Sequence, residues 1–419
     1  MLNQTKSNVY GYLAVYLLLL FKAGFYFVEQ SNIITAPLFF LFLLFVAAKT
    51  NKGGLTLDVD NLKVSLVLVV LISITNVFCG MPTIKEFFNL ILNLFTAVVF
   101  VSIISKNMFI KTYCDIIFYI SIASIIGWVL MTVFPSFFNI IPKLVNTSDR
   151  IGYFCGLTIV SDFRGAGMQR TQGVFWEPGA YQCLVVIAML LEKYYYKAPR
   201  RRIRIVVNSA AIILSFSTAG YVALILVWIV ILSKNAKGFH LGRIIGISIF
   251  VVVLFFAVGP KLSGQLWYTI TFKIQGMLDY KNATNYAITS RAGSIIEPLK
   301  LFILSPIIGI GENGYNKVTE IVGLSTCTPV NYICKYGIIF AGINFYGFYK
   351  FIRVKGMGVA EVMFIIFTLI ITFLAESFFM NPILSIFMLY GYKWERKSEE
   401  SLTNERVCIK ENKRIYMKG

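Results

Sequence analysis

The most regular feature of the chain is a series of apolar stretches separated by short polar segments. From Tyr10 onward these stretches approach the roughly 17 to 25 residues that a helix needs to cross about 30 Å of hydrocarbon. Runs of this length with few charges are typical of membrane-spanning helices. We therefore predict an all-α integral membrane protein of about twelve transmembrane helices. The predicted spans are Tyr10 to Val28, Ile33 to Ala48, Val64 to Gly80, Phe87 to Ile104, Cys114 to Phe134, Phe175 to Leu191, Ile205 to Phe216, Tyr221 to Leu232, Ile244 to Val258, Tyr336 to Tyr349, Val359 to Leu374 and Phe378 to Tyr392.

Composition agrees with this interpretation, because the chain is more apolar than soluble domains are. Hydrophobic residues make up 57% of the 419 positions and charged residues 14%, and the mean hydropathy is +0.73. A soluble domain is about half apolar and about a quarter charged. The net charge of +19 comes from short clusters of Lys and Arg between apolar stretches, so we do not expect nucleic acid as a partner.

The distribution of Lys and Arg predicts how the spans are oriented. When successive connections are assigned to alternate sides, every compact basic cluster falls on one side, which the positive-inside rule identifies as cytoplasmic. Both termini are then cytoplasmic. Residues 1–392 are predicted to form one transmembrane domain, and residues 393–419 a basic cytoplasmic tail. The cluster from Arg200 to Arg204 is expected to set the orientation and to contact anionic lipid.

Two connections on the opposite side are long, residues 135–174 and residues 259–335. The second is too long for a passive connection, and apolar residues recur at helical spacing from Leu262 to Met277, which predicts a helix lying in the membrane interface. A second helix of this kind is predicted from Ile295 to Ile303. The segment from Gly309 to Gly314 then holds three glycines, which permit tight turns and close backbone approach.

Two pairs of predicted spans are too short for each helix to cross a bilayer. Basic clusters flank the stretch Ile205 to Leu232 on both sides, so the chain must turn back within it, at Ser217 to Gly220. Because about 15 helical residues at 1.5 Å each reach only about 23 Å, this turn would lie below the outer surface. The same holds for Val359 to Tyr392, whose polar turn runs from Glu376 to Pro382. The two turns predict a recessed outward chamber, with long, tilted and kinked helices as the alternative.

A charged pair, Arg170 and Glu177, lies at the mouth of a span whose start is marked by Pro178 and Gly179. Charged groups at a membrane boundary are costly unless they are solvated, paired or functional. Two interpretations follow, namely a salt bridge that orients the helix and a substrate site.

The residues that metal chemistry requires are scarce. The sequence contains no HExxH motif, no cluster of His or Cys ligands and no carboxylate pair at metal spacing, so we expect neither a metal nor another cofactor. The single histidine, His240, lies in a predicted cytoplasmic connection and is excluded as a base on the outer side. Cys155 and Cys327 lie in the two outer loops and could form a disulfide in an oxidising compartment.

The outer loops are instead marked by arginine. A guanidinium group binds phosphate bidentately, stays charged at any working pH and stabilises an anionic leaving group without a metal. A basic chamber open to the lipid would suit a diphosphate on a polyprenyl chain. The outer arginines are Arg150, Arg164, Arg170 and Arg291.

Several short segments near the outer side form a set that can be compared with known families. They are Arg170 to Tyr181, Ser217 to Gly220, Ser290 to Ala292, Ser305 to Gly311, and Asn331 at the start of a span. Together they resemble the bacterial O-antigen and capsular polysaccharide polymerase family, Wzy, which is similar to the O-antigen ligases. Length, number of spans and the large outer loop agree with that family as well. The resemblance implies the helical, GT-C-like fold of lipid-linked-sugar transferases in the bacterial cytoplasmic membrane.

The resemblance implies a metal-independent glycosyltransferase that moves a growing glycan from undecaprenyl diphosphate onto an incoming lipid-linked repeat unit. Membrane lipid and a chain-length regulator protein would be further partners. Arg170 and Arg291 would bind the diphosphate, and Glu177 would accept the proton of the acceptor hydroxyl or orient the arginines. The substrate-binding residues it implies are Arg164, Ser217, Thr218, Gly309, Gly311 and Asn331.

Two other functions remain open. The ligase branch is expected to carry a histidine just before Asn331, but Val330 stands there, which favours the polymerase and leaves the identity of a general base open. A flippase for lipid-linked oligosaccharides is a non-enzymatic alternative. It would place cations in a central cavity and have short outer loops, so the long loop 259–335 argues against it.

Overall fold

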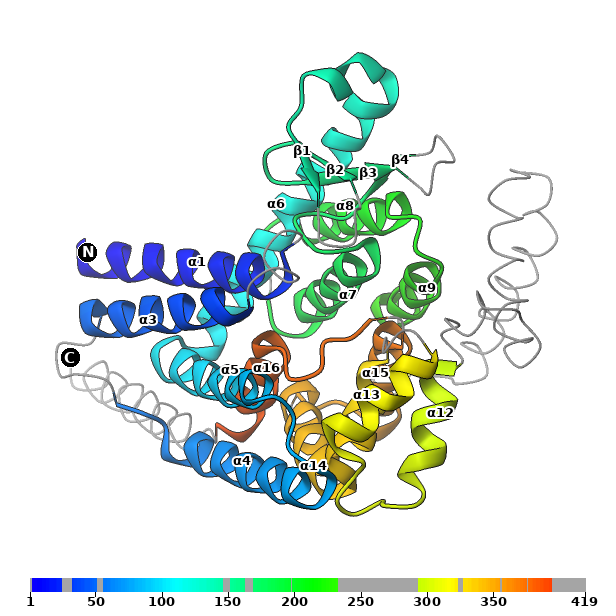
Figure 1. The fold of residues 1–419 in the computed structure, drawn as a ribbon. Helices are drawn as coiled ribbons and strands as arrows, with labels where there is room; N and C mark the ends of the chain where they lie inside the picture. Colours follow the sequence, from blue (N-terminus) through cyan, green and yellow to red (C-terminus); the bar gives the residue numbers. More distant parts are fainter. Residues whose placement is uncertain are drawn as a thin grey trace, which may run out of the picture.

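Helices account for most of the computed structural model, which describes residues 2–24, 32–50, 56–145, 151–162, 169–196, 198–232, 293–322, 327–354, 356–374 and 376–393 (Figure 1). Up to residue 232 the described helices are α1 (Leu2–Ala23), α3 (Asn32–Thr50), α4 (Val59–Cys79), α5 (Ile84–Ile103), α6 (Lys106–Val133), α7 (Pro178–Tyr194), α8 (Arg201–Leu214) and α9 (Thr218–Leu232). From residue 293 onward they are α12 (Gly293–Phe302), α13 (Gly311–Val322), α14 (Thr328–Ile352), α15 (Val359–Phe373) and α16 (Pro382–Tyr392).

The predicted spans and the observed helices correspond closely. Each predicted span that lies in the described residues coincides with a helix, and the span Ile244 to Val258 lies outside them. Among the described residues, three helices, α4, α5 and α6, are both long and apolar enough to cross a membrane, and further apolar helices are shorter. A mostly helical chain with apolar helices suited to a membrane is therefore confirmed, whereas the number twelve stays a prediction.

Two short helices form the centre of the bundle. Every residue of α7 from Pro178 to Glu192 is buried, and so is every residue of α16 from Pro382 to Tyr390. α7 contacts α6, α8, α9 and α15, while α16 contacts α14, α5, α1 and α4. A β-carbon added to Gly391 of α16 would lie 2.0 Å from the carbonyl oxygen of Gly347 in α14, so small residues let these two helices approach closely.

Several helix ends meet at one end of the bundle. The predicted topology assigns these helix ends to the cytoplasmic side. Arg204 at the start of α8 binds Glu192 near the end of α7 at 2.7 Å and Asp115 in α6 at 3.0 Å. Tyr194 in the last turn of α7 donates to Glu361 in the first turn of α15 at 2.6 Å. We call this the basic end. The Arg204 side chain is only 8% exposed, so this member of the basic cluster serves the ion pairs. Contact of the cluster Arg200 to Arg204 with lipid stays a prediction.

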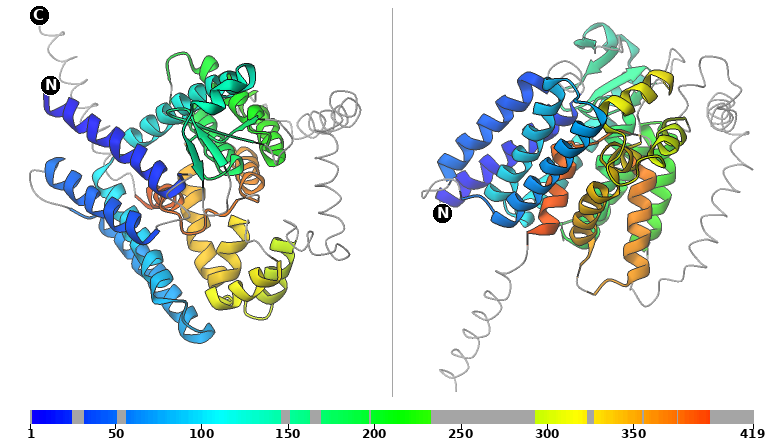
Figure 2. Two further views of the ribbon diagram at one scale, coloured as in Figure 1. Left: turned by 45° about the horizontal axis from the view of Figure 1, so that its top comes forward. Right: turned by 60° about the horizontal axis from the view of Figure 1, so that its bottom comes forward.

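The opposite end gathers the helix ends that flank the long loops, and we call it the loop end. Gly24, just after α1, pairs with Phe175, just before α7. The side-chain amide of Asn381, before α16, donates to the carbonyl of Lys22 in α1 at 2.7 Å. The two views of Figure 2 show α1, α3 and α5 side by side on one flank, and α12 and α13 beside α14 on another. The contacts show that α1 runs toward the loop end and that α7 and α16 run away from it. The orientation of these helices across a membrane stays a prediction.

The loop 135–174 contains a small antiparallel sheet that the sequence pattern did not predict. It follows a 3-10 turn, Pro135–Asn139, and consists of β1 (Lys143–Val145), β2 (Ile151–Phe154), β3 (Ile159–Asp162) and β4 (Gln169–Thr171) in the order β1-β2-β3-β4. The sheet packs on α6, where Ser124 lies 3.0 Å from the Thr158 hydroxyl and Trp128 donates to the Gln169 carbonyl at 2.8 Å. It therefore covers the loop end of that helix.

The loop 259–335 is described from Gly293 onward. The predicted helix from Ile295 to Ile303 is confirmed as α12, and the predicted helix from Leu262 to Met277 lies outside the described residues. α13 was not predicted, because few of its positions are apolar. Its buried residues Tyr315 and Val318 face the rest of the loop end.

Candidate functional site

Three helices begin with proline in the first turn at the loop end. α7 starts at Pro178, α16 starts at Pro382, and α14 starts at Thr328 with proline next in the chain. Proline suits the first turn of a helix because an N–H there has no intrahelical partner and the proline φ is already helical. These residues define where the helices begin, and the positive ends of three helix dipoles point toward the loop end.

The α15–α16 turn, residues 376–381, brings these starts together. The backbone N–H of Thr328 donates to the carbonyl of Glu376 at 3.2 Å, and the N–H of Phe378 donates to the Thr328 hydroxyl at 2.8 Å. The Phe378 ring lies 4.8 Å from the ring of Trp176, which precedes α7. One short turn therefore lines the starts of both α7 and α14.

Glu376 lies directly against the first turn of α7. A β-carbon added to Gly179 would lie 1.7 Å from Oε1 of Glu376, so only glycine leaves room for this carboxylate. Glu376 is 3% exposed. A carboxylate is favoured at a helix N-terminus, where backbone N–H groups and the dipole attract negative charge. The buried acid is thus a member of the site that the predicted residues did not include.

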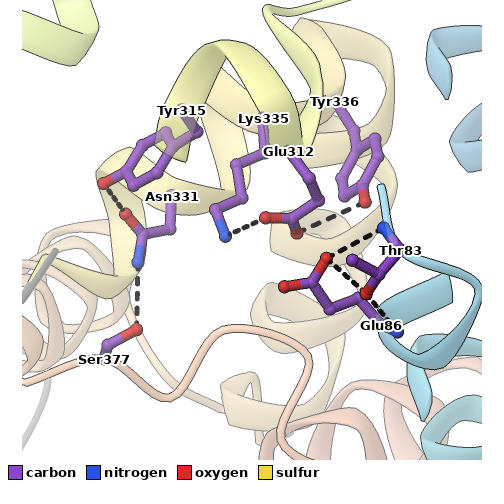
Figure 3. A network of polar contacts seen from close by, with 8 residues as sticks. All are labelled: Thr83, Glu86, Glu312, Tyr315, Asn331, Lys335, Tyr336 and Ser377. Atoms are coloured by element: carbon purple, nitrogen blue, oxygen red, sulfur yellow. Dashed lines mark hydrogen bonds and ion pairs between the residues drawn. The ribbon is translucent and has the colours of Figure 1, made fainter. Parts of the chain in front are cut away.

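Asn331 is fully buried and links two elements of the site. Its carbonyl oxygen accepts from the Tyr315 hydroxyl of α13, and its amide nitrogen donates to Ser377 at 3.0 Å (Figure 3). Of the predicted substrate-binding residues that the structure describes, Asn331 is the one joined to the α15–α16 turn by a hydrogen bond. Val330 beside it is also buried, which leaves no titratable group at the position where a histidine was considered.

An ion pair lies one turn further along α14. The ammonium of Lys335 is 2.6 Å from Oε2 of Glu312, and the two side chains are 13% and 10% exposed. Oε1 of Glu312 accepts from the Tyr336 hydroxyl at 3.4 Å (Figure 3). The same ammonium lies 4.7 Å from the ring centre of Tyr315 and 4.8 Å from that of Phe379. Contact with Phe379 ties the pair to the α15–α16 turn.

The helix α14 is interrupted directly after this pair. Gly337 has φ 81° and ψ 176°, a conformation open essentially to glycine alone. The segment after α12 fills the break, because the N–H of Ile338 donates to the carbonyl of Pro306 and the N–H of Ile310 donates to that of Cys334, each at 2.9 Å. The N–H of Ile338 and the carbonyl of Cys334, which the break leaves without helical partners, therefore form hydrogen bonds with the segment that follows α12.

Gly309 and Gly311 allow this insertion. Their φ angles are +85° and +67°, and a β-carbon on Gly309 would lie 2.5 Å from the carbonyl oxygen of Lys335. One on Gly311 would lie 2.7 Å from the β-carbon of Cys79. The sequence predicted that the backbone at these glycines approaches another group closely. In the described residues, Gly309 approaches α14 and Gly311 approaches α4. A role toward a substrate head group stays a prediction.

Arg170 and Glu177 belong to consecutive parts of the segment that leads into α7. Arg170 lies in β4, half-buried, and its Nε donates to the Ser161 hydroxyl of β3 at 3.3 Å. Ser161 in turn donates to Gln172 at 3.0 Å, whose amide donates to the carbonyl of Phe175 at 3.0 Å. Glu177 is the N-cap residue of α7. A chain of hydrogen bonds thus runs from Arg170 to the residues that begin the helix.

The turn between α8 and α9 lies against the next turn of α7. The Ser217 hydroxyl accepts from the N–H of Gly220 at 3.3 Å, and a β-carbon on Gly220 would lie 3.3 Å from Gln182. Thr218 is the first residue of α9. The predicted break between two short helices is confirmed, since α8 has 14 residues and α9 has 15.

Several predicted residues lie outside the described residues, so the pairing of Arg170 with Arg291 stays a prediction. They are Arg150, Arg164, His240 and Arg291.

Cysteine chemistry adds nothing to the site. Cys155 and Cys327 are both free cysteines, so the disulfide considered between them is absent from the described structure. Burial raises the pKa of the Cys155 thiol, which disfavours the reactive thiolate. The described residues also contain no group of three or more His, Cys, Asp or Glu that could hold a metal ion.

The residues that sequence analysis missed are Glu312, Lys335 and Glu376. Their signal was present as single charges near the ends of apolar stretches. Comparisons of the sequence with known protein families and with curated proteins found no match.

Proposed function

We propose that the protein is a membrane glycosyltransferase that polymerises undecaprenyl-diphosphate-linked oligosaccharide repeat units into O-antigen or capsular polysaccharide. The reaction takes place on the outer face of the bacterial cytoplasmic membrane, with both termini in the cytoplasm. Membrane lipid and a chain-length regulator are its further partners. It needs no metal or cofactor.

The observation that supports this proposal best is the meeting of three proline-initiated helix starts around the α15–α16 turn, next to a segment that carries Arg170. The dipole of a helix makes its N-terminus attractive to anions. A guanidinium group adds a full charge and a bidentate grip on phosphate. Together they suit a diphosphate leaving group.

The depth of the turn suits a lipid-linked substrate. α16 has 11 residues and α15 has 15, which correspond to about 16 Å and about 22 Å of helix against about 30 Å of hydrocarbon. Polar backbone at that depth is tolerated only where protein or a water-filled cavity satisfies it. A polyprenyl chain in the membrane could present its diphosphate at such a turn.

The proposed roles follow from this arrangement. Arg170, together with Arg291, binds the diphosphate and stabilises its charge as the sugar departs. Glu177 orients the arginines or takes the proton of the acceptor. Arg164, Ser217, Thr218, Gly309, Gly311 and Asn331 contribute to substrate binding.

The glycan chain-length profile of a deletion strain tests the proposal. Without a polymerase, cells should carry a single repeat unit on the lipid core, and the wild-type gene, but not one encoding Arg291→Ala, should restore long chains. Complete loss of surface glycan would instead indicate a ligase. Accumulation of lipid-linked units on the cytoplasmic face would indicate a flippase, and an unchanged profile would refute all three.

A further inference from the structure

The Glu312–Lys335 ion pair lies where α14 is interrupted, and neither residue has a role in the transfer as described so far. A buried ion pair adds little net stability, because the desolvation of both charges offsets their attraction. The pair joins α13 to α14 directly before the break at Gly337. A largely buried ion pair at this position therefore calls for a chemical role.

Glu312 has capacity for a further hydrogen bond. Its Oε2 faces Lys335, and its Oε1 accepts one long hydrogen bond of 3.4 Å from Tyr336 (Figure 3). Each carboxylate oxygen can accept two hydrogen bonds. A hydroxyl group that approaches Oε1 would find a suitable acceptor there.

The surroundings of the pair are aromatic. The Lys335 ammonium lies over the rings of Tyr315 and Phe379, and the ring of Tyr336 carries the hydroxyl that reaches Glu312. Tyr315 and Tyr336 are buried, so these rings hold the two charged side chains in place. A carboxylate held in this way can accept a hydrogen bond from a sugar hydroxyl.

The pair also lies within reach of the proposed leaving-group site. Phe379 contacts Lys335, and Glu376, three residues earlier in the same turn, lies against Gly179 at the start of α7. Three residues span at most about 11 Å. One substrate head group could therefore extend from the helix starts to the ion pair.

We infer that Glu312 accepts the proton of the incoming sugar hydroxyl and that Lys335 is a positioning residue for its carboxylate. The inference rests on the proposed function. The acceptor oxygen forms a bond to C1 of the donor sugar as the bond from C1 to the diphosphate oxygen breaks. That bonding pair leaves with undecaprenyl diphosphate, and the hydroxyl proton passes to Glu312 and then to water. Glu177 is then left to orient Arg170.

The test uses the full-length protein in proteoliposomes, with the lipid-linked repeat unit extracted from the deletion strain as the substrate. Glu312→Gln should lower the rate of chain growth by about a hundredfold or more, which is typical for the loss of a general base. Glu312→Ala should be equally slow, and added formate should restore part of its rate because it supplies a mobile carboxylate. Lys335→Met should also be slow, and Lys335→Arg should recover activity.

A second ion pair provides the matched control. Glu297 and Lys300 on α12 are also 2.6 Å apart, but their side chains are 32% and 55% exposed. Glu297→Gln should keep the wild-type rate. A near wild-type rate for Glu312→Gln would overturn the inference, as would a folded Glu312→Ala protein that formate does not restore. Failure of the wild-type protein to lengthen chains would instead refute the proposed function, before any variant is compared.

Discussion

At the start of α7, Gly179 and Glu376 lie against each other although they are far apart in the sequence. Gly179 has no side chain, and the carboxylate of Glu376 occupies the space beside it. Arg170 and Glu177 were identified from the sequence as a charged pair at a membrane boundary, whereas Glu376 was visible only as part of a polar turn. A close approach between distant residues leaves no local pattern, so the buried acid could not be assigned to α7 in advance.

Arg170→Lys tests the proposed contact between the Arg170 guanidinium group and the diphosphate. The charge is kept but the planar, bidentate geometry is lost, so we expect the rate of chain growth in proteoliposomes to fall by about a hundredfold. Protein yield and the thermal unfolding midpoint in detergent should not change.

Ser161→Ala is the control for this prediction. It removes the hydrogen bond of 3.3 Å that holds Arg170 within the sheet but leaves the guanidinium group intact. We expect a much smaller loss of activity. Equal losses in the two variants would mean that Arg170 acts by supporting the sheet, and full activity of Arg170→Lys would contradict the contact.

Some helices and strands can be predicted from their own residues, and others cannot. α5 begins with a capping box formed by Thr83 and Glu86, and α6 begins after the N-cap Ser105, so both starts are encoded locally. The strands of the small sheet have only three or four residues, too few to show a clear alternation. α14 reads as one apolar stretch, but it is broken at Gly337 by a segment from another loop.

Gly337→Ala should destabilise the protein at the break in α14. An alanine β-carbon would lie 1.9 Å from the carbonyl oxygen of Ile307, and the backbone conformation itself is strained for any residue but glycine by about 1–3 kcal/mol. We expect a clearly lower thermal unfolding midpoint in detergent, together with loss of activity.

The same helix offers the comparison variant. An added β-carbon at Gly342 meets nothing within 4 Å, and alanine favours a helix over glycine by about 1 kcal/mol. Gly342→Ala should therefore leave the unfolding midpoint unchanged or raise it. If Gly337→Ala proved equally stable, the break in α14 would not be required for the fold.

The whole molecule is organised by the two ends of the bundle. At the basic end, Arg204 bridges Asp115 and Glu192, and the Tyr12 hydroxyl of α1 donates to Asp115 at 2.8 Å. These contacts join four helices, α1, α6, α7 and α8. The site at the loop end depends on the direction of α7, and the ion-pair network holds the other end of that helix.

Arg204→Met should destabilise the whole bundle. It leaves two carboxylates without their cation, and breaking a buried ion pair from one side costs about 3–5 kcal/mol. Unfolding in detergent with increasing denaturant should reveal the loss.

The exposed neighbour Arg202 provides the control, because Arg202→Met should change the unfolding free energy by less than about 0.5 kcal/mol. Adding Asp115→Asn and Glu192→Gln to Arg204→Met should recover part of the loss. If Arg204→Met unfolded like the wild-type protein, the network would not hold the basic end together.

The sequence by itself determined most of the described helices, because apolar length and proline at helix starts are local properties. It also indicated the recessed turns between α8 and α9 and between α15 and α16. Of the predicted site, it placed Glu177 at the start of α7 and Asn331 near the start of α14, both from single polar residues at the edges of apolar stretches.

Only the tertiary structure decided which of these residues meet. The insertion at Gly337, the contact of Glu376 with Gly179, and the partners of Arg204 each join segments from different parts of the chain. Such pairings depend on the packing of whole helices, and the burial of a charge or the room for a carboxylate cannot be read from one segment. For this reason most of the described helices could be predicted from the sequence, while the ion pair at the break in α14 could not.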